Sequence, residues 1–191
     1  MGEVAVRAAK AANYESAGTI EFLLDKNKKF YFMEMNTRIQ VEHPVTEWVT
    51  GMDLVKEQIR IANDEVLHLR QEELFQRGHA IECRICAEDT ENNFMPSPGI
   101  IKQLTEPNGI GVRIDSYVYE GYEIPIYYDP MIGKLIVWAT TRQYAIERMR
   151  RVLYEYKITG LKTNLSYLKR IMHTPDFAVS YTHLRAHETE A

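Results

Sequence analysis

The chain has 191 residues, of which 45% are hydrophobic and 26% charged, with a formal net charge of -4. These values are ordinary for a globular protein of one or two domains, and the absence of a basic stripe argues against nucleic-acid binding. No apolar run approaches the roughly 18 residues that a membrane span needs, and the N-terminus has no signal-peptide core. We therefore predict a cytoplasmic protein that binds neither nucleic acid nor membranes.

The N-terminal part predicts a helix, a hairpin and a second helix. Residues 3–12 are rich in alanine, which favours a short helix. Residues 19–42 contain two strand-forming runs separated by a polar stretch, which is typical of a β-hairpin. Residues 51–62 predict the second helix, with Thr50 as its cap and Asp53 three residues further on.

The most informative segment is residues 34–47, which read EMNTRIQVEHPVTE. Five polar side chains fall there at two-residue spacing: Glu34, Asn36, Arg38, Gln40 and Glu42. On an extended backbone alternate side chains share one face, so these five form a polar row. The ordinary alternative is the wet side of an exposed strand. Because the preceding residues 30–33 suit burial on both faces, we expect the row to line a cleft.

The hairpin brings another carboxylate to this row. If residues 26–29 form a four-residue loop, Glu21 lies directly across from Glu34 on the same face. Like charges at that spacing, with Cβ atoms about 5 Å apart, repel each other. A divalent cation would offset the repulsion, since Mg²⁺ and Mn²⁺ prefer oxygen ligands, and Asn36 could add its carbonyl oxygen. The residues alone leave open the alternative of a solvated glutamate pair near the loop lysines.

A domain boundary is expected between residues 74 and 75, where the pattern turns polar and irregular. Beyond it we expect short strands at residues 80–87, 99–104, 112–117 and 134–139, separated by proline and glycine. Two amphipathic helices follow, one with an apolar stripe and one capped by Thr163. The stripes consist of Ile146, Met149, Val152, Leu153 and Tyr156, and of Leu165, Leu168 and Met172. The fold class is therefore α+β, and the second domain, residues 75–179, is small and mostly β with closing helices.

Two cysteines and one arginine in the first strand of this second domain invite a chemical interpretation. Cys83 and Cys86 have C-x-x-C spacing, but no second pair or convergent histidines accompany them. We predict reduced thiols, as in a reducing compartment. Arg84 shares a strand face with Glu82, so a cross-strand ion pair is the ordinary interpretation and catalysis the alternative.

Two residues near prolines also need an interpretation. His43 falls on the odd-numbered face of the expected strand, so we predict a structural hydrogen-bonding role, with Pro44 ending the strand. Asp129 precedes Pro130, and it either forms a turn or supports an arginine at a substrate site.

A family resemblance runs through both halves of the chain. The segment EMNTRIQVEHPVTE, followed by GMDLVKEQIRIA, resembles the biotin carboxylase component of acetyl-CoA carboxylase, an ATP-grasp enzyme. The resemblance covers roughly residues 2–177, through AGTIEFL before that segment and RGHAIECRICAED, FMPSPG, GVRIDS, YYDPMIGKLIVW and GLKTN after it. Pyruvate carboxylases read closer to VNPRVQVEHTVTE, so Thr37 and Pro44 favour the acetyl-CoA type. The implied fold is the C-terminal part of an ATP-grasp domain, residues 1–74, followed by a biotin carboxylase C-terminal domain, residues 75–179.

The resemblance implies a metal and nucleotide role for the hairpin carboxylates. Glu21 and Glu34, with Asn36 beside them, would hold the Mg²⁺ or Mn²⁺ that bridges the phosphates of ATP. By the same resemblance, the activity is that of an ATP-dependent ligase. It carboxylates biotin on a carrier protein, in the first half-reaction of acetyl-CoA carboxylase in fatty acid synthesis.

The resemblance also implies where bicarbonate and biotin bind. Arg38, Gln40 and the backbone of Val41 would bind bicarbonate, and Glu42 would be the general base that deprotonates it, so that carboxyphosphate forms. Arg84 would hold the carboxylating species and the biotin enolate. The implied partners are a biotin carboxyl carrier protein and a carboxyltransferase, and the full-length enzyme is expected to be a homodimer.

The chain also departs from the family pattern. The upstream dinucleotide-like domain, the glycine-rich lid and the phosphate-binding lysines have no counterpart, so we expect the chain alone to be inactive. The alternatives are a non-catalytic module that self-associates, an ATP-grasp ligase for another carboxylate, or the biotin carboxylase part of another biotin-dependent carboxylase. Residues 180–191 resemble translated adaptor sequence and are left out of the fold prediction.

Overall fold

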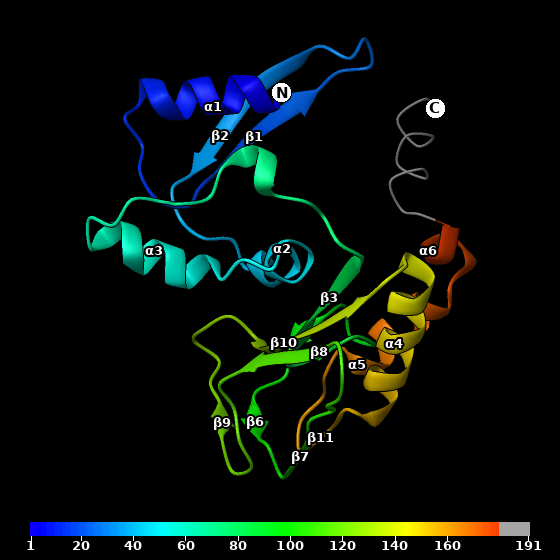
Figure 1. The fold of residues 1–191 in the computed structure, drawn as a ribbon. Coiled ribbons are helices and arrows are strands. Elements are labelled where there is room, and N and C mark those ends of the chain that lie inside the picture. Colours follow the sequence, from blue (N-terminus) through cyan, green and yellow to red (C-terminus); the bar gives the residue numbers. More distant parts are fainter. Residues whose placement is uncertain (180–191) are drawn as a thin grey trace. The chain divides into compact units, whose positions relative to one another are not determined.

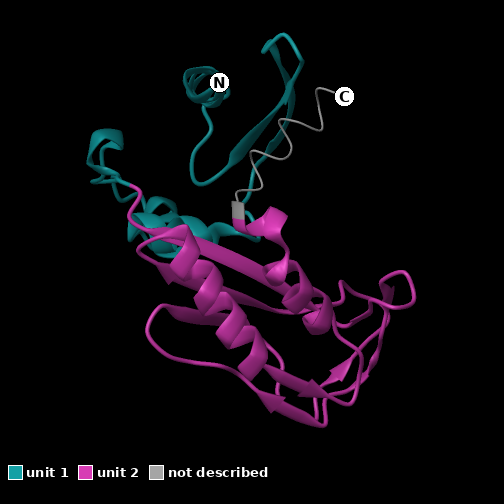
Figure 2. Cartoon of the chain, turned by 90° about the vertical axis from the view of Figure 1, so that its right-hand side faces the viewer, with its two compact units in different colours: residues 1–75, 186–191 teal, residues 76–185 magenta. Residues whose placement is uncertain are grey.

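The computed structural model describes residues 1–179, which combine helices and strands in two compact units, residues 1–75 and 76–179 (Figures 1 and 2). The division falls one residue beyond the boundary that the sequence predicted. The expected tail, residues 180–191, lies outside the described residues. Within residues 1–179, no helix combines the length and the apolar character that a membrane crossing requires.

The first unit contains a hairpin and several helices. Its elements are helix α1 (Gly2–Ala11), strands β1 (Thr19–Leu24) and β2 (Phe30–Asn36), helices α2 (His43–Thr50) and α3 (Leu54–Ala62), and a short 3-10 helix (Gln71–Glu73).

The predicted start of the second helix was wrong. Gly51 ends α2 in the left-handed conformation (φ 76°), which a residue without Cβ adopts readily. Thr50 therefore belongs to α2, and α3 begins only after Asp53. The Asp53 carboxylate caps α3 by accepting a hydrogen bond from the Lys56 N–H at 2.8 Å.

The hairpin confirms the central prediction about register. Strands β1 and β2 pair antiparallel, and Glu21 lies opposite Glu34. The register shifts next to this pair, where Phe22 faces Phe32 and Met33 is the extra residue of a bulge.

The turn accounts for this shift. The Asp25 carboxylate accepts hydrogen bonds from the N–H groups of Asn27 (2.9 Å) and Lys29 (2.8 Å). These bonds fix a connection over residues 25–29, whereas the sequence suggested a four-residue loop over 26–29.

The expected extension of the strand to Glu42 was wrong. Strand β2 ends at Asn36, and residues 37–42 are irregular, with a bend at Arg38 and a turn at residues 41–42 before α2. Pro44 does not end a strand; it lies in the first turn of α2 and is buried. Proline suits this position because its ring fixes φ near the helical value and its missing N–H would have no partner there.

The expected burial of residues 30–33 was also wrong. Phe30 is 37% exposed and Phe32 60% exposed, because a two-stranded hairpin cannot cover both of its own faces. Among the described residues, the buried hydrophobic core lies entirely in the second unit.

The second unit is built on a three-stranded antiparallel sheet in the order β3-β10-β8 (Figure 1). These strands are β3 (His79–Cys86), β10 (Met131–Ala139) and β8 (Val112–Ser116). Three short pairs surround it: β4 (Glu88–Asp89) with β5 (Met95–Pro96), β6 (Gly99–Ile100) with β9 (Glu123–Ile124), and β7 (Gln103–Thr105) with β11 (Lys157–Thr159). Helices α4 (Arg142–Glu155), α5 (Leu165–His173) and α6 (Pro175–Val179) complete the unit.

The core lies between this sheet and α4. The odd-numbered residues of β3, from Ile81 to Ile85, are buried, and the predicted stripe of α4 is buried against them. The Thr141 hydroxyl caps α4 by accepting the Tyr144 N–H at 3.2 Å. Helix α5 carries the second predicted stripe, but its N-cap is Asn164 and not Thr163. The opposite face of β3 carries Arg84.

Candidate functional site

A chain of hydrogen bonds joins four of the predicted site residues in the first unit. Asn36 Nδ2 donates to Glu21 Oε1 at 2.8 Å. Arg38 Nη2 donates to Asn36 Oδ1 at 3.3 Å, and Arg38 Nη1 donates to Gln40 Oε1 at 3.0 Å. Three members of the predicted polar row, Asn36, Arg38 and Gln40, are therefore joined in one hydrogen-bonded series with Glu21, although Arg38 and Gln40 follow the strand and do not belong to it.

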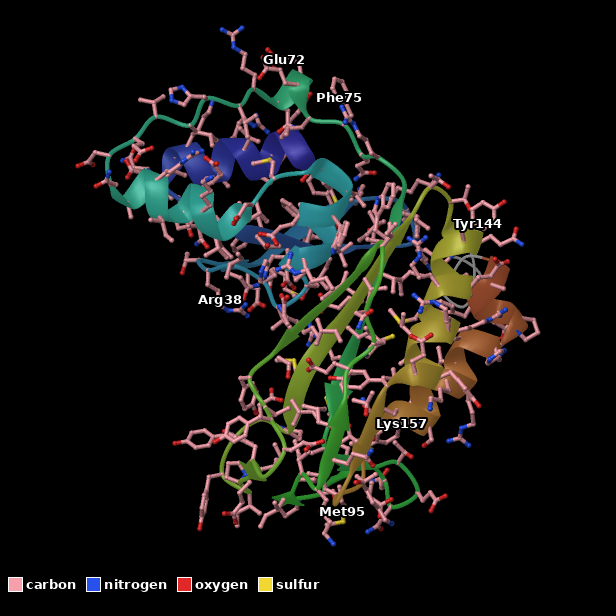
Figure 3. The ribbon with its side chains drawn as sticks, turned by 60° about the horizontal axis from the view of Figure 1, so that its bottom comes forward. Arg38, Glu72, Phe75, Met95, Tyr144 and Lys157 are labelled. Carbon is pink, nitrogen blue, oxygen red and sulfur yellow. The ribbon has the colours of Figure 1, made fainter. Side chains whose placement is uncertain are left out.

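The Arg38 guanidinium is held by its neighbours. Nη1 also donates to the Ile39 carbonyl at 3.2 Å, so three acceptors orient a side chain that is exposed at the surface of the first unit (Figure 3). A guanidinium held in this way presents its planar fork to an anion with less loss of conformational freedom on binding.

The turn before α2 orients the end of the row. The His43 N–H donates to the Gln40 carbonyl at 3.2 Å, and His43 Nδ1 lies 2.8 Å from the same oxygen. His43 thus makes the local hydrogen bond that its structural role required. Glu42 is the N-cap of α2, its side chain is exposed, and Val41 precedes it in the turn.

The hairpin carboxylates fit a divalent cation that is shared with a phosphate ligand. Glu21 is half-buried and lies opposite the exposed Glu34. Among residues 1–179, no group of three or more histidine, cysteine, aspartate or glutamate residues is placed to hold a metal ion by itself. Mg²⁺ is commonly bound through one or two carboxylates while phosphates and water complete its octahedron. The two carboxylates therefore suit this ion when a nucleotide supplies the remaining oxygens, whereas the Asn36 amide oxygen accepts a hydrogen bond from Arg38.

Arg84 lies in the second unit, exposed on β3 and paired with Lys134 of β10. Lys134 Nζ lies 3.4 Å from Asp115 Oδ2, and Arg113 donates to both Asp115 oxygens at 2.7 and 2.9 Å. Burial alone would raise the pKa of Asp115, but the bonds and charges of Arg113 and Lys134 outweigh it and hold that pKa below its usual value. The sheet face beside Arg84 thus contains an ionised carboxylate balanced by two cations.

The other predicted residues have structural roles. Asp129 Oδ1 accepts the Met131 N–H at 2.8 Å, which is the turn role expected before Pro130. Cys83 and Cys86 are free thiols, and burial raises their pKa to about 12 and about 11. Thiols with such pKa values carry almost no thiolate at neutral pH.

One residue that the sequence did not single out is bound to the strand of Arg84. Asn164 is buried (8% exposed) and its side chain is hydrogen-bonded to the β3 backbone. Its only signal in the sequence is its position at the end of the segment GLKTN.

Comparisons with known proteins agree with this division of the chain. Residues 82–188 match the family described as biotin carboxylase C-terminal domain. Residues 1–70 match the family described as carbamoyl-phosphate synthase L chain, ATP binding domain.

Similar proteins include a biotin carboxylase and a pyruvate carboxylase subunit. The biotin carboxylase of Nostoc sp. is 61% identical over 177 residues, covering 93% of this chain and 40% of that protein. A pyruvate carboxylase subunit of Methanothermobacter thermautotrophicus is 58% identical over 177 residues, covering 93% of this chain and 36% of that protein. The chain therefore spans about 40% or less of the length of these relatives.

A solved structure shares the fold. The biotin carboxylase domain of the Hydrogenobacter thermophilus 2-oxoglutarate carboxylase, a dimer in complex with MgADP, ADP and bicarbonate, matches with a TM-score of 0.89 and 51% identity. The match covers 93% of this chain and 39% of that one. With more than half of its residues matched by the family, this chain belongs to the biotin carboxylase C-terminal domain family.

Proposed function

We propose that this chain supplies the metal, bicarbonate and biotin contacts of a biotin carboxylase, an ATP-dependent ligase that carboxylates biotin on a carrier protein. The observation that carries the proposal is the hydrogen-bonded series Glu21, Asn36, Arg38 and Gln40, which starts at the carboxylate pair. It combines oxygen ligands for a cation with a cationic fork for a small planar anion.

The hairpin binds the cation of MgATP. Glu21 and Glu34 would hold Mg²⁺ or Mn²⁺, with Asn36 bridging from Glu21 to the anion-binding arginine. When bound, the ion neutralises charge on the phosphates as the γ-phosphoryl group is transferred.

The bend and turn bind bicarbonate. The Arg38 fork, the Gln40 amide and the Val41 backbone N–H hold the anion, and Glu42 accepts its proton as it attacks. A bicarbonate oxygen forms a bond to the γ-phosphorus while the bond from that phosphorus to the leaving oxygen breaks. The products are carboxyphosphate and ADP. Orienting a weak nucleophile in this way is a large part of the rate gain.

Arg84 acts at the following step, in which the bond between the carboxyl carbon and the phosphate oxygen of carboxyphosphate breaks. The released phosphate takes the proton of the biotin N–H, and that nitrogen forms a bond to the released CO₂. The Arg84 guanidinium holds the carboxylating species and the enolate oxygen of biotin, because both carry the negative charge that the fork matches. The biotin is presented by a biotin carboxyl carrier protein, and a carboxyltransferase uses the product. The full-length enzyme is proposed to be a cytoplasmic homodimer.

The proposed final acceptor is acetyl-CoA, so the parent carboxylase serves fatty acid synthesis. Thr37 and Pro44 favour this type, whereas relatives of similar identity are named for pyruvate and methylcrotonoyl-CoA carboxylation. These acceptors can be distinguished with the complex that the parent enzyme forms with the carboxyltransferase of the same cell. The purified complex is given acetyl-CoA or pyruvate, and the carboxylated product is measured. Carboxylation of pyruvate alone would contradict the acetyl-CoA assignment.

A chimeric enzyme tests the function of the chain itself. In this chimera the chain replaces the matching 177 residues of the Nostoc biotin carboxylase, which supplies the remainder of the enzyme. We expect bicarbonate-dependent ATP cleavage that free biotin stimulates. Glu42→Gln should lower turnover by at least ~10²-fold while the KM for ATP changes by less than about twofold.

The exposed Glu15→Gln provides a matched control in the same unit. Unchanged turnover in Glu42→Gln would remove Glu42 from the mechanism. A folded chimera without any bicarbonate-dependent cleavage would contradict the proposed function.

A further inference from the structure

Asn164 uses its side chain in an unusual way. It is the N-cap of α5, where an asparagine normally accepts a hydrogen bond from its own helix. Here it makes no such bond, and its side chain binds β3. Nδ2 donates to the Arg84 carbonyl at 3.0 Å, and Oδ1 accepts the Cys86 N–H at 2.9 Å. The Asn164 backbone N–H donates to the Cys86 carbonyl at 3.0 Å.

These three bonds occupy an otherwise open strand edge. Strand β3 lies at the edge of its sheet, with β10 on one side only. The Ala87 N–H donates to the carbonyl of Pro130, the residue directly before β10, so the backbone groups of Ala87 point toward β10. Because backbone groups of successive residues alternate between the two edges, those of Arg84 and Cys86 point away from β10. Asn164 therefore takes the place of a neighbouring strand along the residues that carry Arg84.

The pairing of β3 with β10 is irregular at this end of β3. Met131 pairs with Cys86 and Gly133 with Ile85, so Ile132 is the extra residue of a bulge. A bulge interrupts the regular ladder of hydrogen bonds. The backbone of Arg84 and Cys86 therefore depends on Asn164 for the contacts that a regular sheet would supply from both sides.

The loop that carries Asn164 is itself fixed. Lys162 Nζ lies 2.6 Å from Asp89 Oδ2, and the Lys162 N–H donates to Ser97 Oγ at 3.0 Å. Gly160 has φ 104°, and a Cβ at this position would collide with the Ile100 carbonyl. The segment GLKTN thus joins two parts of the second unit, and Asn164 is its contact with β3.

We propose that Asn164 is a positioning residue. It holds the β3 backbone at Arg84 in the position from which the guanidinium contacts the biotin enolate and the carboxylating species. This inference rests on the proposed function, because it assigns Asn164 to the biotin-dependent step. The bonds of Asn164 go to the β3 backbone at Arg84 and Cys86, so its effect is expected at Arg84. A displacement of about 1 Å at a reacting group can cost about 10²-fold in rate.

The coupling ratio of the chimeric enzyme tests the proposal. The measured quantity is carboxybiotin formed per ATP cleaved, with ATP cleavage in the absence of biotin as the reference. In Asn164→Ala the ratio should fall about tenfold while the reference rate changes by less than about twofold, because Arg84 alone is disturbed. A purely structural role would lower both activities together and leave the ratio unchanged, which would overturn the proposal.

Three further variants make the test specific. Asn164→Asp keeps the acceptor for Cys86 but sets a carboxylate oxygen against the Arg84 carbonyl, so its ratio should fall at least as far as in Asn164→Ala while the Cys86 N–H keeps its acceptor. Ser166→Ala changes an exposed residue of α5 and should leave the ratio unchanged. Arg84→Ala combined with Asn164→Ala should be no worse than Arg84→Ala alone, and additive losses would show independent roles.

Hydrogen exchange in the full chain separates this inference from the proposed function. Asn164→Ala should speed exchange of the Cys86 amide by at least about tenfold, relative to Ser166→Ala, because that N–H loses its acceptor. If the wild-type chimera is inactive, the proposed function fails and Asn164 loses its role with it. If the chimera is active but the Cys86 amide is unaffected, only the positioning by Asn164 is refuted.

Discussion

Replacing Arg38 by lysine tests whether the fork of this side chain binds bicarbonate. Lysine keeps the charge but has a single ammonium group, so it cannot contact Asn36 and Gln40 from two nitrogens as Arg38 does. One charge-assisted hydrogen bond contributes about 1.5–3 kcal/mol, which corresponds to roughly 10- to 150-fold in an equilibrium constant. We expect the loss of one such bond to bicarbonate, and therefore a rise of that size in the KM for bicarbonate.

The stability of the protein should hardly change, because Arg38 is exposed and exposed polar pairs contribute about 0–1 kcal/mol. The assay is a bicarbonate titration of ATP cleavage by the chimera, with the KM for ATP measured in parallel. Arg60→Lys is the matched control, since Arg60 is an exposed arginine of the same unit that binds Glu57 at 2.8 Å. A bicarbonate KM within about twofold of wild type in Arg38→Lys would refute the assignment of this anion to the fork.

Three other outcomes follow from the structure. Glu34→Gln should shift the Mg²⁺ titration of the chimera to higher concentration, since one of the two facing carboxylates is lost; an unchanged titration would refute the cation site. Cys83 should resist iodoacetamide in the native chain at pH 8 and react after unfolding, because burial raises its pKa to about 12; rapid native alkylation would contradict this burial. Burial, and secondarily Arg142, lower the pKa of His79 below 6.5, so the unfolded state binds the proton more readily. The stability that neutral His79 allows is therefore fully present above pH 6.5 and is lost as the pH falls below it, through the lower folded pKa. His79→Gln should make the urea midpoint less dependent on pH below 6.5, and an unchanged dependence would contradict this role.

The candidate site shows how far a periodic pattern can be trusted. Two-residue spacing correctly put Glu34 and Asn36 on one face, because side-chain alternation is local geometry. The prediction that Glu21 lies opposite Glu34 was also confirmed, but it assumed a loop over residues 26–29, and the bulge at Met33 offsets the different turn. The same pattern wrongly extended the strand through Arg38 to Glu42. Proline at position 44 favours a helix start as well as a strand end, and only the surrounding structure selects between these two uses.

Burial was predictable only where the chain contains both packing partners. The stripe of α4 and the odd-numbered residues of β3 are buried as their periods indicated, because each supplies the apolar face that the other needs. Phe32 and its neighbours have the composition of a buried strand but are exposed, since no apolar surface of the first unit covers them within the described residues. The composition of a strand shows that it is able to pack against an apolar surface, but it does not show whether such a surface is present.

The sequence by itself determined the family resemblance, the paired carboxylates and the chemical identity of the candidate ligands. These features depend on residue type and short spacing, which the chain carries directly. Only the tertiary structure decided that Arg38 is fixed by hydrogen bonds from both sides and that Asn164 is bound to the strand of Arg84. Asn164 lies 80 residues from Arg84 in the chain, and a contact over that separation is set by the packing of a helix start against an open strand edge, which no local pattern encodes.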